Sequence, residues 1–180
     1  HAVQGERVRV EALRPDGTVF TSMRACNGGP HDPQSKMPGR KWLSISRDGG
    51  GTWSFPKPWR YDDGEPGTPF YSPDSFSQCL RLANGQLLWI GNLMETNPVH
   101  GGPREQLYIG EVNEQTMRLR KESLFLVAAR QPGDPPTSLS NFSAHEDRET
   151  GEILFYLPWF VEQEKDKWGA DTWLYRIGVH

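Results

Sequence analysis

The chain has 180 residues, which is enough for one domain with a hydrophobic core. Its 20 lysines and arginines against 23 aspartates and glutamates give a formal net charge of -3, which argues against a nucleic-acid or anionic-membrane partner. No apolar run approaches the ~20 residues of a membrane helix. The 19 glycines, 15 prolines and seven tryptophans favour an all-β protein with many turns. Because no secretion signal precedes His1, we expect a mature form or a piece of a longer protein.

Three tight-turn sequences recur along the chain at an even spacing. They are centred on Gly17, Gly85 and Gly151, which are 68 and 66 residues apart. Apolar or alternating runs flank each turn, and Asp-Gly and Asn-Gly pairs of the kind found at the first two turns are strong hairpin signals. After each hairpin and a long loop, a third strand is predicted to begin near Trp42, Leu107 or Trp173.

This repeated meander predicts a β-propeller of four-stranded antiparallel blades. We expect blade 1 at about residues 5–62, blade 2 at about 74–128 and blade 3 at about 140–180. Fourth strands are predicted at 53–61 and 118–127, and blade 3 lacks one. Amphipathic helices are excluded because glycines and prolines interrupt every window that is long enough.

Roughly three blades make an incomplete propeller, since propellers close with ~4–8 blades. An open arc leaves bare blade faces and strand edges, which promote aggregation. We therefore expect that the 180 residues belong to a larger propeller whose remaining blades lie on the same chain. The alternative is that copies of the chain associate to close a ring.

Alternating strand directions sort the connections between strands into two ends of each blade. The tight turns share one end with the turn at residues 46–53, and the long loops lie at the opposite end, which we call the rim. Long loops on a rigid scaffold commonly carry binding sites. The rim loops are 24–40, 61–75, 92–106, 130–140 and 159–171.

The rim loops are rich in carboxylates, arginines and aromatic rings, which suits a sugar ligand. Glycoside hydrolysis needs an acid and a base or nucleophile, and tyrosine can serve as the nucleophile. The catalytic candidates are Asp74, Asp32 and Tyr71. Arginine forks match a substrate carboxylate. The candidate substrate-binding residues are Arg24, His31, His100, Arg104, Arg130 and Asn141. Asp62, Asp63, Glu65, Trp159 and Trp168 are also assigned to the rim.

Other chemistries find less support in the sequence. His31 and His100 have no partner at metal-ligand spacing, so neither a metal nor another cofactor is expected. Residues 62–65 are more typical of a polar turn than of a cation site. No Gly-x-Ser-x-Gly sequence supports an esterase. Cys26 and Cys79 are expected to be ordinary buried thiols rather than a disulfide.

The turn after the third strand of blade 1 has a distinctive sequence, Ser-x-Asp-x-Gly-x-Thr-Trp. Its fixed positions are Ser46, Asp48, Gly50, Thr52 and Trp53. We expect the carboxylate of Asp48 to accept hydrogen bonds from the turn, and Trp53 to fold back over it. This sequence resembles the Asp-box of the sialidase-like, BNR-repeat β-propellers, where the motif is structural.

The resemblance implies a secreted or periplasmic protein that acts on glycans, of the bacterial glycosyl hydrolase type. The leading hypothesis is a glycoside hydrolase for a terminal sugar, acidic sugars included, whose site further blades complete. A second hypothesis is a propeller that binds a glycan or a protein without catalysis, and a third is a self-associating half-propeller without a site. Rim carboxylates about 5–10 Å apart would favour the first. Arginines and aromatics without such a pair would favour the second, and closed symmetric oligomers the third.

Overall fold

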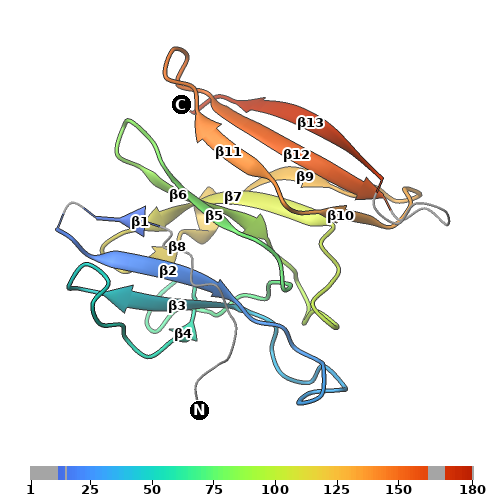
Figure 1. The fold of residues 1–180 in the computed structure, drawn as a ribbon, viewed down its shortest axis with the longest axis horizontal. Helices are drawn as coiled ribbons and strands as arrows, with labels where there is room; N and C mark the ends of the chain where they lie inside the picture. Colours follow the sequence, from blue (N-terminus) through green and yellow to red (C-terminus); the bar gives the residue numbers. More distant parts are fainter. Residues whose placement is uncertain (1–11, 15, 162–168, 180) are drawn as a thin grey trace.

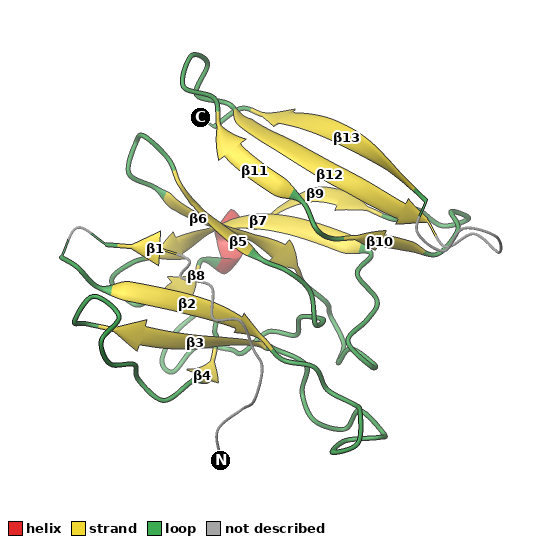
Figure 2. Ribbon diagram, viewed as in Figure 1, coloured by secondary structure: helices red, strands yellow, loops and turns green. Residues whose placement is uncertain are grey.

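The computed structural model describes residues 12–14, 16–161 and 169–179 (Figure 1). The protein is all-β, as predicted: its described residues form three antiparallel sheets, and none of these closes on itself. Figure 2 shows the sheets side by side with the second in the middle.

Sheet 1 is a four-stranded meander formed from the first third of the chain. It runs through β1 (Ala12–Leu13), β2 (Val19–Arg24), β3 (Lys41–Ser46) and β4 (Lys57–Pro58). The fourth strand is much shorter than the expected 53–61, because the residues before Lys57 belong to the turn that follows β3.

Sheet 2 repeats this order and adds a break in its outer strand. It runs through β5 (Gln78–Arg81), β6 (Leu87–Asn92), β7 (Gln106–Asn113) and β8 (Arg118–Leu119). A 3-10 turn, η1 (Lys121–Ser123), separates β8 from β9 (Phe125–Ala129), and β9 also pairs with β7. The expected fourth strand at 118–127 is therefore present in two pieces.

Sheet 3 is organised around β12 (Ile153–Val161). β10 (Thr137–Leu139) and β11 (Ser143–Glu146) pair with successive parts of one edge of β12. β13 (Ala170–Ile177) pairs with the other edge. β10 was not predicted, since its three residues follow a proline-rich stretch and have no clear alternation.

The first two tight turns are built identically. In the first turn, the N–H of Arg14 donates to the carbonyl of Thr18, and the N–H of Gly17 donates to the carbonyl of Arg14. In the second turn, the N–H of Leu82 donates to the carbonyl of Gln86, and the N–H of Gly85 donates to the carbonyl of Leu82. The turn before β12 is one residue longer. The φ angles of Gly17, Gly85 and Gly151 are 80°, 91° and 71°, which glycine adopts without steric cost. Figure 1 shows these turns at one end of the sheets and the loops 24–40 and 93–105 at the other.

Two hydrophobic clusters hold the sheets together. Between sheets 1 and 2, Trp59 is 1% exposed, and its ring centroid lies 6.3 Å from that of Phe20 and 5.7 Å from that of Trp89. Its indole N–H donates to the carbonyl of Met117 at 2.8 Å. The cluster between sheets 2 and 3 includes Ile90 and Phe155. Each sheet is therefore anchored to the next through its face.

Candidate functional site

The turn after β3 has the hydrogen bonds that its sequence predicts. Asp48 accepts one from the N–H of Thr52 and one from its hydroxyl, both at 2.8 Å, and another from the Ser46 hydroxyl at 2.7 Å. These bonds, led by that of the Thr52 N–H, lower the pKa of Asp48 to about 2. The Trp53 indole N–H donates to the carbonyl of Gly50, so Trp53 folds back over the turn. Asp48 therefore has a structural role.

At the opposite end, two buried or half-buried asparagines tie the rim loops of sheets 1 and 2 to each other. The amide of Asn27 donates to the carbonyls of Met37 at 3.0 Å and Pro98 at 2.6 Å. Asn97, on the other loop, makes the reverse connection: its amide donates to the carbonyl of Met37 at 3.1 Å and accepts a hydrogen bond from the N–H of Gly39 at 2.8 Å. The two loops therefore form one fixed surface.

Asp32, a predicted catalytic residue, serves as an anchor within its own loop. It is 8% exposed and accepts hydrogen bonds from the N–H groups of Lys36 and Met37, both at 2.9 Å, and from Gly28 at 3.4 Å. Burial works to raise its pKa, but the hydrogen bonds from Met37, Lys36 and Gly28 outweigh this and the pKa is lowered. This geometry fits a carboxylate that closes a loop, and we do not assign it to catalysis.

Asp74 is the predicted residue around which other predicted residues gather. Its carboxylate lies 3.2 Å from the Nε of Arg24, and its carbonyl accepts from Nη2 of Arg104 at 2.5 Å. Its N–H donates to the carbonyl of Gly101 at 3.2 Å. A Cβ at Gly101 would lie 3.0 Å from the Cβ of Asp74, so this close approach of the two loops needs glycine.

The pKa values of two groups in this cluster, Arg104 and Cys26, are shifted by burial and by neighbouring charges. Burial, together with the neighbouring charge of Arg24, lowers the pKa of Arg104, while Asp74 acts in the opposite direction. Burial and the charge of Asp74 raise the pKa of the Cys26 thiol. The cluster thus holds two guanidinium groups beside a carboxylate and a protonated thiol.

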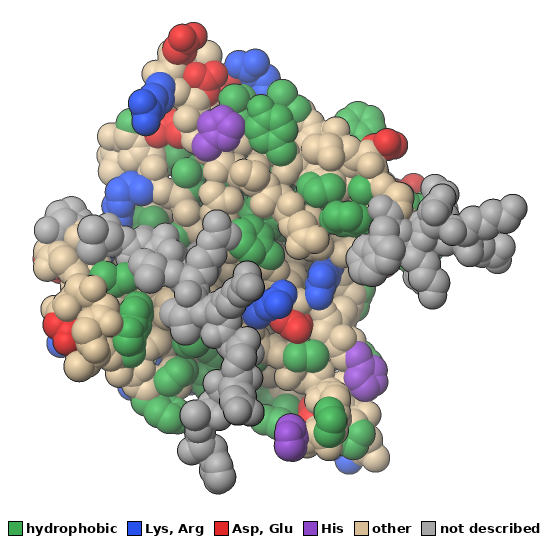
Figure 3. Space-filling view, in the orientation of Figure 1, with side chains coloured by type: hydrophobic (Ala, Val, Ile, Leu, Met, Phe, Trp, Pro, Cys, Tyr) green, Lys and Arg blue, Asp and Glu red, His purple; other side chains and the backbone are tan. Residues whose placement is uncertain are grey.

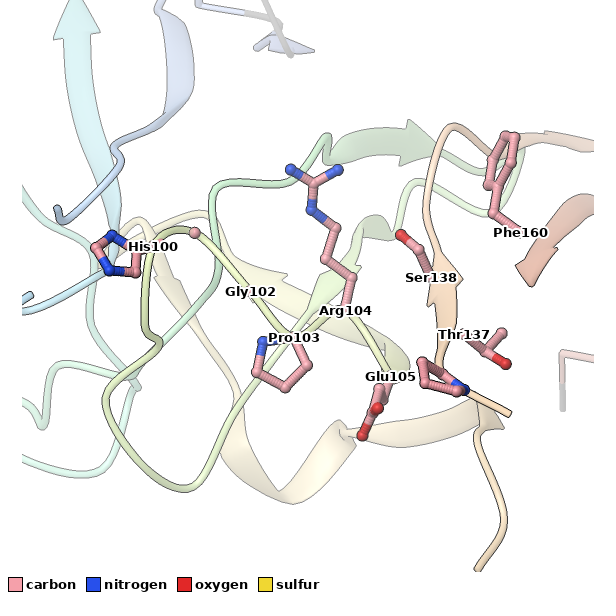
Figure 4. A pocket seen from close by; sticks show the side chains of 10 residues that line it. His100, Gly102, Pro103, Arg104, Glu105, Thr137, Ser138 and Phe160 are labelled. Atoms are coloured by element: carbon pink, nitrogen blue, oxygen red, sulfur yellow. The ribbon is translucent and has the colours of Figure 1, made fainter. Parts of the chain in front are cut away.

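A pocket of about 430 Å³ opens beside Arg104. Its walls come from the loop before β7 and from β10 and β12, and they are His100, Gly101, Gly102, Pro103, Arg104, Glu105, Pro136, Thr137, Ser138 and Phe160. In Figure 4 the Arg104 side chain extends between His100 on one side and Ser138 and Phe160 on the other. The pocket therefore combines a cation, a carboxylate, two hydroxyls and an aromatic ring.

Of the remaining predicted residues, Arg130 contacts a residue of the pocket wall, whereas Tyr71, His31 and Asn141 do not line the pocket. Arg130 donates to the carbonyls of Asp134 and Pro135 and forms a 3.1 Å ion pair with Glu105, so it supports a pocket wall. Arg40 lies over the ring of Tyr71, 5.6 Å from its centroid. His31 is exposed in a turn of the loop after β2, and Asn141, with φ of 58°, lies in the bend between β10 and β11.

The prediction that residues 62–65 belong to the rim is wrong. Asp62 accepts from the amide of Asn113 at 2.6 Å, and Glu65 holds Arg118 with two bonds of 2.9 and 2.8 Å. Both partners flank the β7–β8 turn, at the far end of sheet 2. The connection between sheets 1 and 2 runs to that turn before it returns to Asp74. The carboxylates of this segment form a polar turn, as its sequence favoured.

Two further expectations concern aromatic and sulfur side chains. The Trp159 indole donates to the hydroxyl of Tyr175 at 3.1 Å, whereas Trp168 lies outside the described residues. The prediction of two buried thiols is wrong, because Cys26 is exposed beside Asp74 and Cys79 is half-buried; the two do not form a disulfide with each other. The structure described in residues 12–14, 16–161 and 169–179 holds no group of three or more histidine, cysteine or acidic residues that could bind a metal ion.

Of the ten wall residues, sequence reasoning named only His100 and Arg104 as candidates, and those it missed include Gly101, Glu105, Ser138 and Phe160. The last two lie in sheet 3, on or opposite the unpredicted strand β10. Gly101 and Glu105 lie in the same loop as Arg104. They differ from ordinary exposed loop residues only because other loops approach them, through Asp74 at Gly101 and Arg130 at Glu105.

The chain matches no protein-family model and no curated protein at a significant level. Among the described residues, no helix is both long and apolar enough to span a membrane.

Proposed function

We propose that the three sheets are blades of an incomplete β-propeller of the sialidase-like type. Two observations support this. Sheets 1 and 2 share a strand order and an identical first turn, and sheet 3 repeats the same hairpin with one extra residue. Each sheet also packs on the next through a hydrophobic face. In this proposal further blades, on the same polypeptide or on a second copy, complete the ring.

We further propose that the rim binds a terminal acidic sugar and that the protein is a glycoside hydrolase. The observation that carries this proposal is the meeting of Arg24 and Arg104 at Asp74, beside the 430 Å³ pocket. The planar guanidinium groups suit a substrate carboxylate, and Ser138 and Thr137 suit sugar hydroxyls. The ring of Phe160 offers an apolar wall to a sugar face. A secreted or periplasmic location belongs to the same proposal, because such glycans are extracellular.

In this hydrolase Asp74 transfers the proton to or from the glycosidic oxygen. Because its backbone is held by Gly101 and Arg104, its carboxyl group is positioned before substrate arrives. Arg24, whose side chain is 59% exposed, is free to turn from Asp74 to a ligand carboxylate. Glu105 is the carboxylate that lines the pocket itself, and Arg130 fixes it. The two acids provide the acid and base roles that glycoside hydrolysis requires.

A second candidate function is glycan binding without catalysis. The observation in its favour is the anchoring of Asp32, which removes one of the expected rim carboxylates from the site. The arginines and the pocket remain, and they are sufficient for recognition of an acidic sugar.

The test compares the wild-type protein with Asp74→Asn on aryl glycosides that include a sialoside. The variant keeps the backbone contacts of Asp74 and removes its negative charge, and with that charge both the proton transfer and the ion pair with Arg24. We expect turnover by the wild type and a loss of at least about 100-fold in kcat in the variant, with glycan affinity changed less than about tenfold. Asp134→Asn is the matched control, because Asp134 also lies in a rim loop and its carboxylate accepts a hydrogen bond from the N–H of Gln131 instead of meeting Arg24; it should keep full activity.

Binding is measured on the same proteins by calorimetry with sialic acid and with a neutral sugar. Sialic acid binding without turnover on any glycoside would establish the second candidate function instead of the first. An affinity for sialic acid that survives Arg104→Ala, or the absence of any binding and turnover, would overturn both.

A further inference from the structure

Residues 99–102 form a small hairpin that carries His100 at its tip. The N–H of Val99 donates to the carbonyl of Gly102 at 3.0 Å, and the N–H of Gly102 donates to the carbonyl of Val99 at 3.1 Å. The two residues between them, His100 and Gly101, have φ angles of 50° and 77°. Two-residue hairpin turns with positive φ at both positions prefer the pair Asn-Gly. The backbone of this turn therefore suits asparagine better than histidine, and the turn alone does not explain the imidazole ring.

The loop 24–40 of sheet 1 holds the His100 ring in place. Oγ of Ser35 accepts a hydrogen bond from the N–H of His100 at 3.1 Å and lies 3.5 Å from Nδ1 of the ring. A Cβ at Gly28 would lie 2.6 Å from the same Nδ1, so the ring packs directly on the backbone of that residue. The loop itself is fixed, because Asp32 closes it through three backbone N–H groups. The ring therefore has a set position before any ligand arrives.

His100 also lines the pocket of about 430 Å³ beside Arg104. Figure 4 shows it across that pocket from Ser138 and Phe160. Nε2 of its ring makes no hydrogen bond to any residue that the structure describes. A ring nitrogen that is held in place at a pocket wall, without a protein partner, is available to a ligand.

Charged and titratable groups of three loops face the hairpin tip. They are Asp32 from loop 24–40, Arg104 and Glu105 from the loop of His100 itself, and Asp74 and Cys26, which lie beside Gly101. Glu105 is paired with Arg130 and Asp74 with Arg24. The other pocket walls, from β10 and β12, are uncharged. An imidazolium at this place attracts the carboxylate of Asp32 and repels the guanidinium of Arg104.

We propose that His100 is a specificity-determining residue of the pocket, whose imidazolium binds the acidic group of the ligand together with Arg104. This inference rests on the proposed function, because it takes the terminal acidic sugar as the ligand. Histidine side chains gain a proton as the pH falls from about 8 to 5, whereas arginine stays charged and a sugar carboxylate stays ionised. An acidic sugar therefore gains a charge-assisted hydrogen bond at the lower pH, and a neutral sugar gains none.

The test measures the affinity of the 180-residue protein for sialic acid and for galactose by calorimetry at pH 5.5 and pH 8.0. We expect the wild type to bind sialic acid about fivefold or more tightly at pH 5.5, with galactose affinity changed less than about twofold. The decisive variant is His100→Asn, which gives the turn its preferred Asn-Gly pair and removes the ring. It should unfold at no lower temperature than the wild type, and its sialic acid affinity should change less than about twofold between the two pH values.

His145→Asn is the matched control, because His145 lies on β11, is exposed and does not line the pocket. It should keep the pH dependence of the wild type. Equal sialic acid affinity of the wild type at both pH values, or a pH dependence that survives in His100→Asn, would overturn the role of His100 and leave the proposed function standing. The absence of sialic acid binding at either pH would instead overturn the proposed function, and this inference with it.

Discussion

At the scale of single residues, aspartates of this chain hold turns and loops as well as the candidate site. Asp48 and Asp32 each accept three or more hydrogen bonds within their own segments, the first from Ser46 and Thr52 and the second from backbone N–H groups. Asp74 instead meets side chains from other loops. The partner of each carboxylate, rather than its residue type, distinguishes structure from candidate chemistry.

The pKa of Asp48 predicts how its turn responds to acid. A folded-state pKa of about 2, below the ordinary 3.8, means that the ionised carboxylate stabilises the fold. This contribution is complete above the ordinary pKa and is lost as the pH falls from about 4 to 2. We expect Asp48→Asn to lower the urea midpoint at pH 6, with a difference from wild type that shrinks by pH 2.5. A difference that stays constant over this range would contradict the assignment.

Asn27 predicts a cost for separating the two rim loops. It is 2% exposed and its amide donates to three carbonyls, those of Ser35, Met37 and Pro98. Asn27→Ala leaves these oxygens without that donor, so we expect a loss of about 1–3 kcal/mol in the free energy of unfolding, measured in urea. Gln115→Ala, at an exposed turn position, serves as the control and should change stability by less than about 0.5 kcal/mol.

At the scale of elements, the connections between sheets matter as much as the strands. The segment after β4 supplies Trp59 and Phe70 to the cluster between sheets 1 and 2, although neither belongs to a strand. The corresponding connection after β9 brings one aromatic residue, Phe142, to the cluster between sheets 2 and 3, beside which a groove of about 500 Å³ remains. The space between sheets 1 and 2 and the space between sheets 2 and 3 both have apolar walls, and they differ in the side chains that the connecting segment places between the sheets.

Trp59 is the clearest test of this packing. Its side chain contacts both sheets, and its truncation would leave a cavity and an unpaired carbonyl at Met117. We expect Trp59→Ala to destabilise the protein by about 3–5 kcal/mol, and Trp59→Phe by less because most of the volume remains. Thermal unfolding followed by circular dichroism measures both. Phe55→Ala, on an exposed side chain, should leave the melting temperature unchanged, and a similar effect of the two alanine variants would contradict the cluster's role.

At the scale of the whole molecule, sheet 3 has one face packed on sheet 2 and one face open. On the open face Tyr156 pairs with Leu174, and these side chains are 40% and 50% exposed. His145 stacks on Tyr156 with ring centroids 5.9 Å apart. Figure 3 shows hydrophobic side chains and a histidine together over this sheet. The corresponding residues of sheet 2, Ile90 and Ile109, are buried against sheet 3.

This open face predicts self-association of the 180-residue protein. Because the face repeats one that is buried in sheet 2, we expect a second copy to cover it at micromolar concentrations. Light scattering should show a mass that rises with concentration for the wild type. Leu174→Glu should weaken the association at least about tenfold, whereas Phe55→Glu should not. A wild-type protein that stays monomeric at about 100 µM would refute the prediction.

Much of the local structure was predictable because it depends on neighbouring residues. The glycines of the tight turns and the Ser46–Trp53 hydrogen bonds follow from sequences of four to eight residues. The candidate site was predictable in part: Asp74, Arg24 and Arg104 meet, but Asp32 does not join them. Which loop carboxylates face one another depends on contacts over tens of residues, such as Asp62 with Asn113, and short patterns carry no record of these contacts.

The amino-acid sequence by itself determined the all-β class, the hairpins, their spacing and the turn at Asp48. It did so because turn chemistry and alternation act over short distances. The tertiary structure decided that the connection after sheet 1 runs to the β7–β8 turn, that Cys26 is exposed, and that β10 forms a pocket wall. These features depend on how sheets pack face to face, and packing joins residues that the sequence keeps far apart.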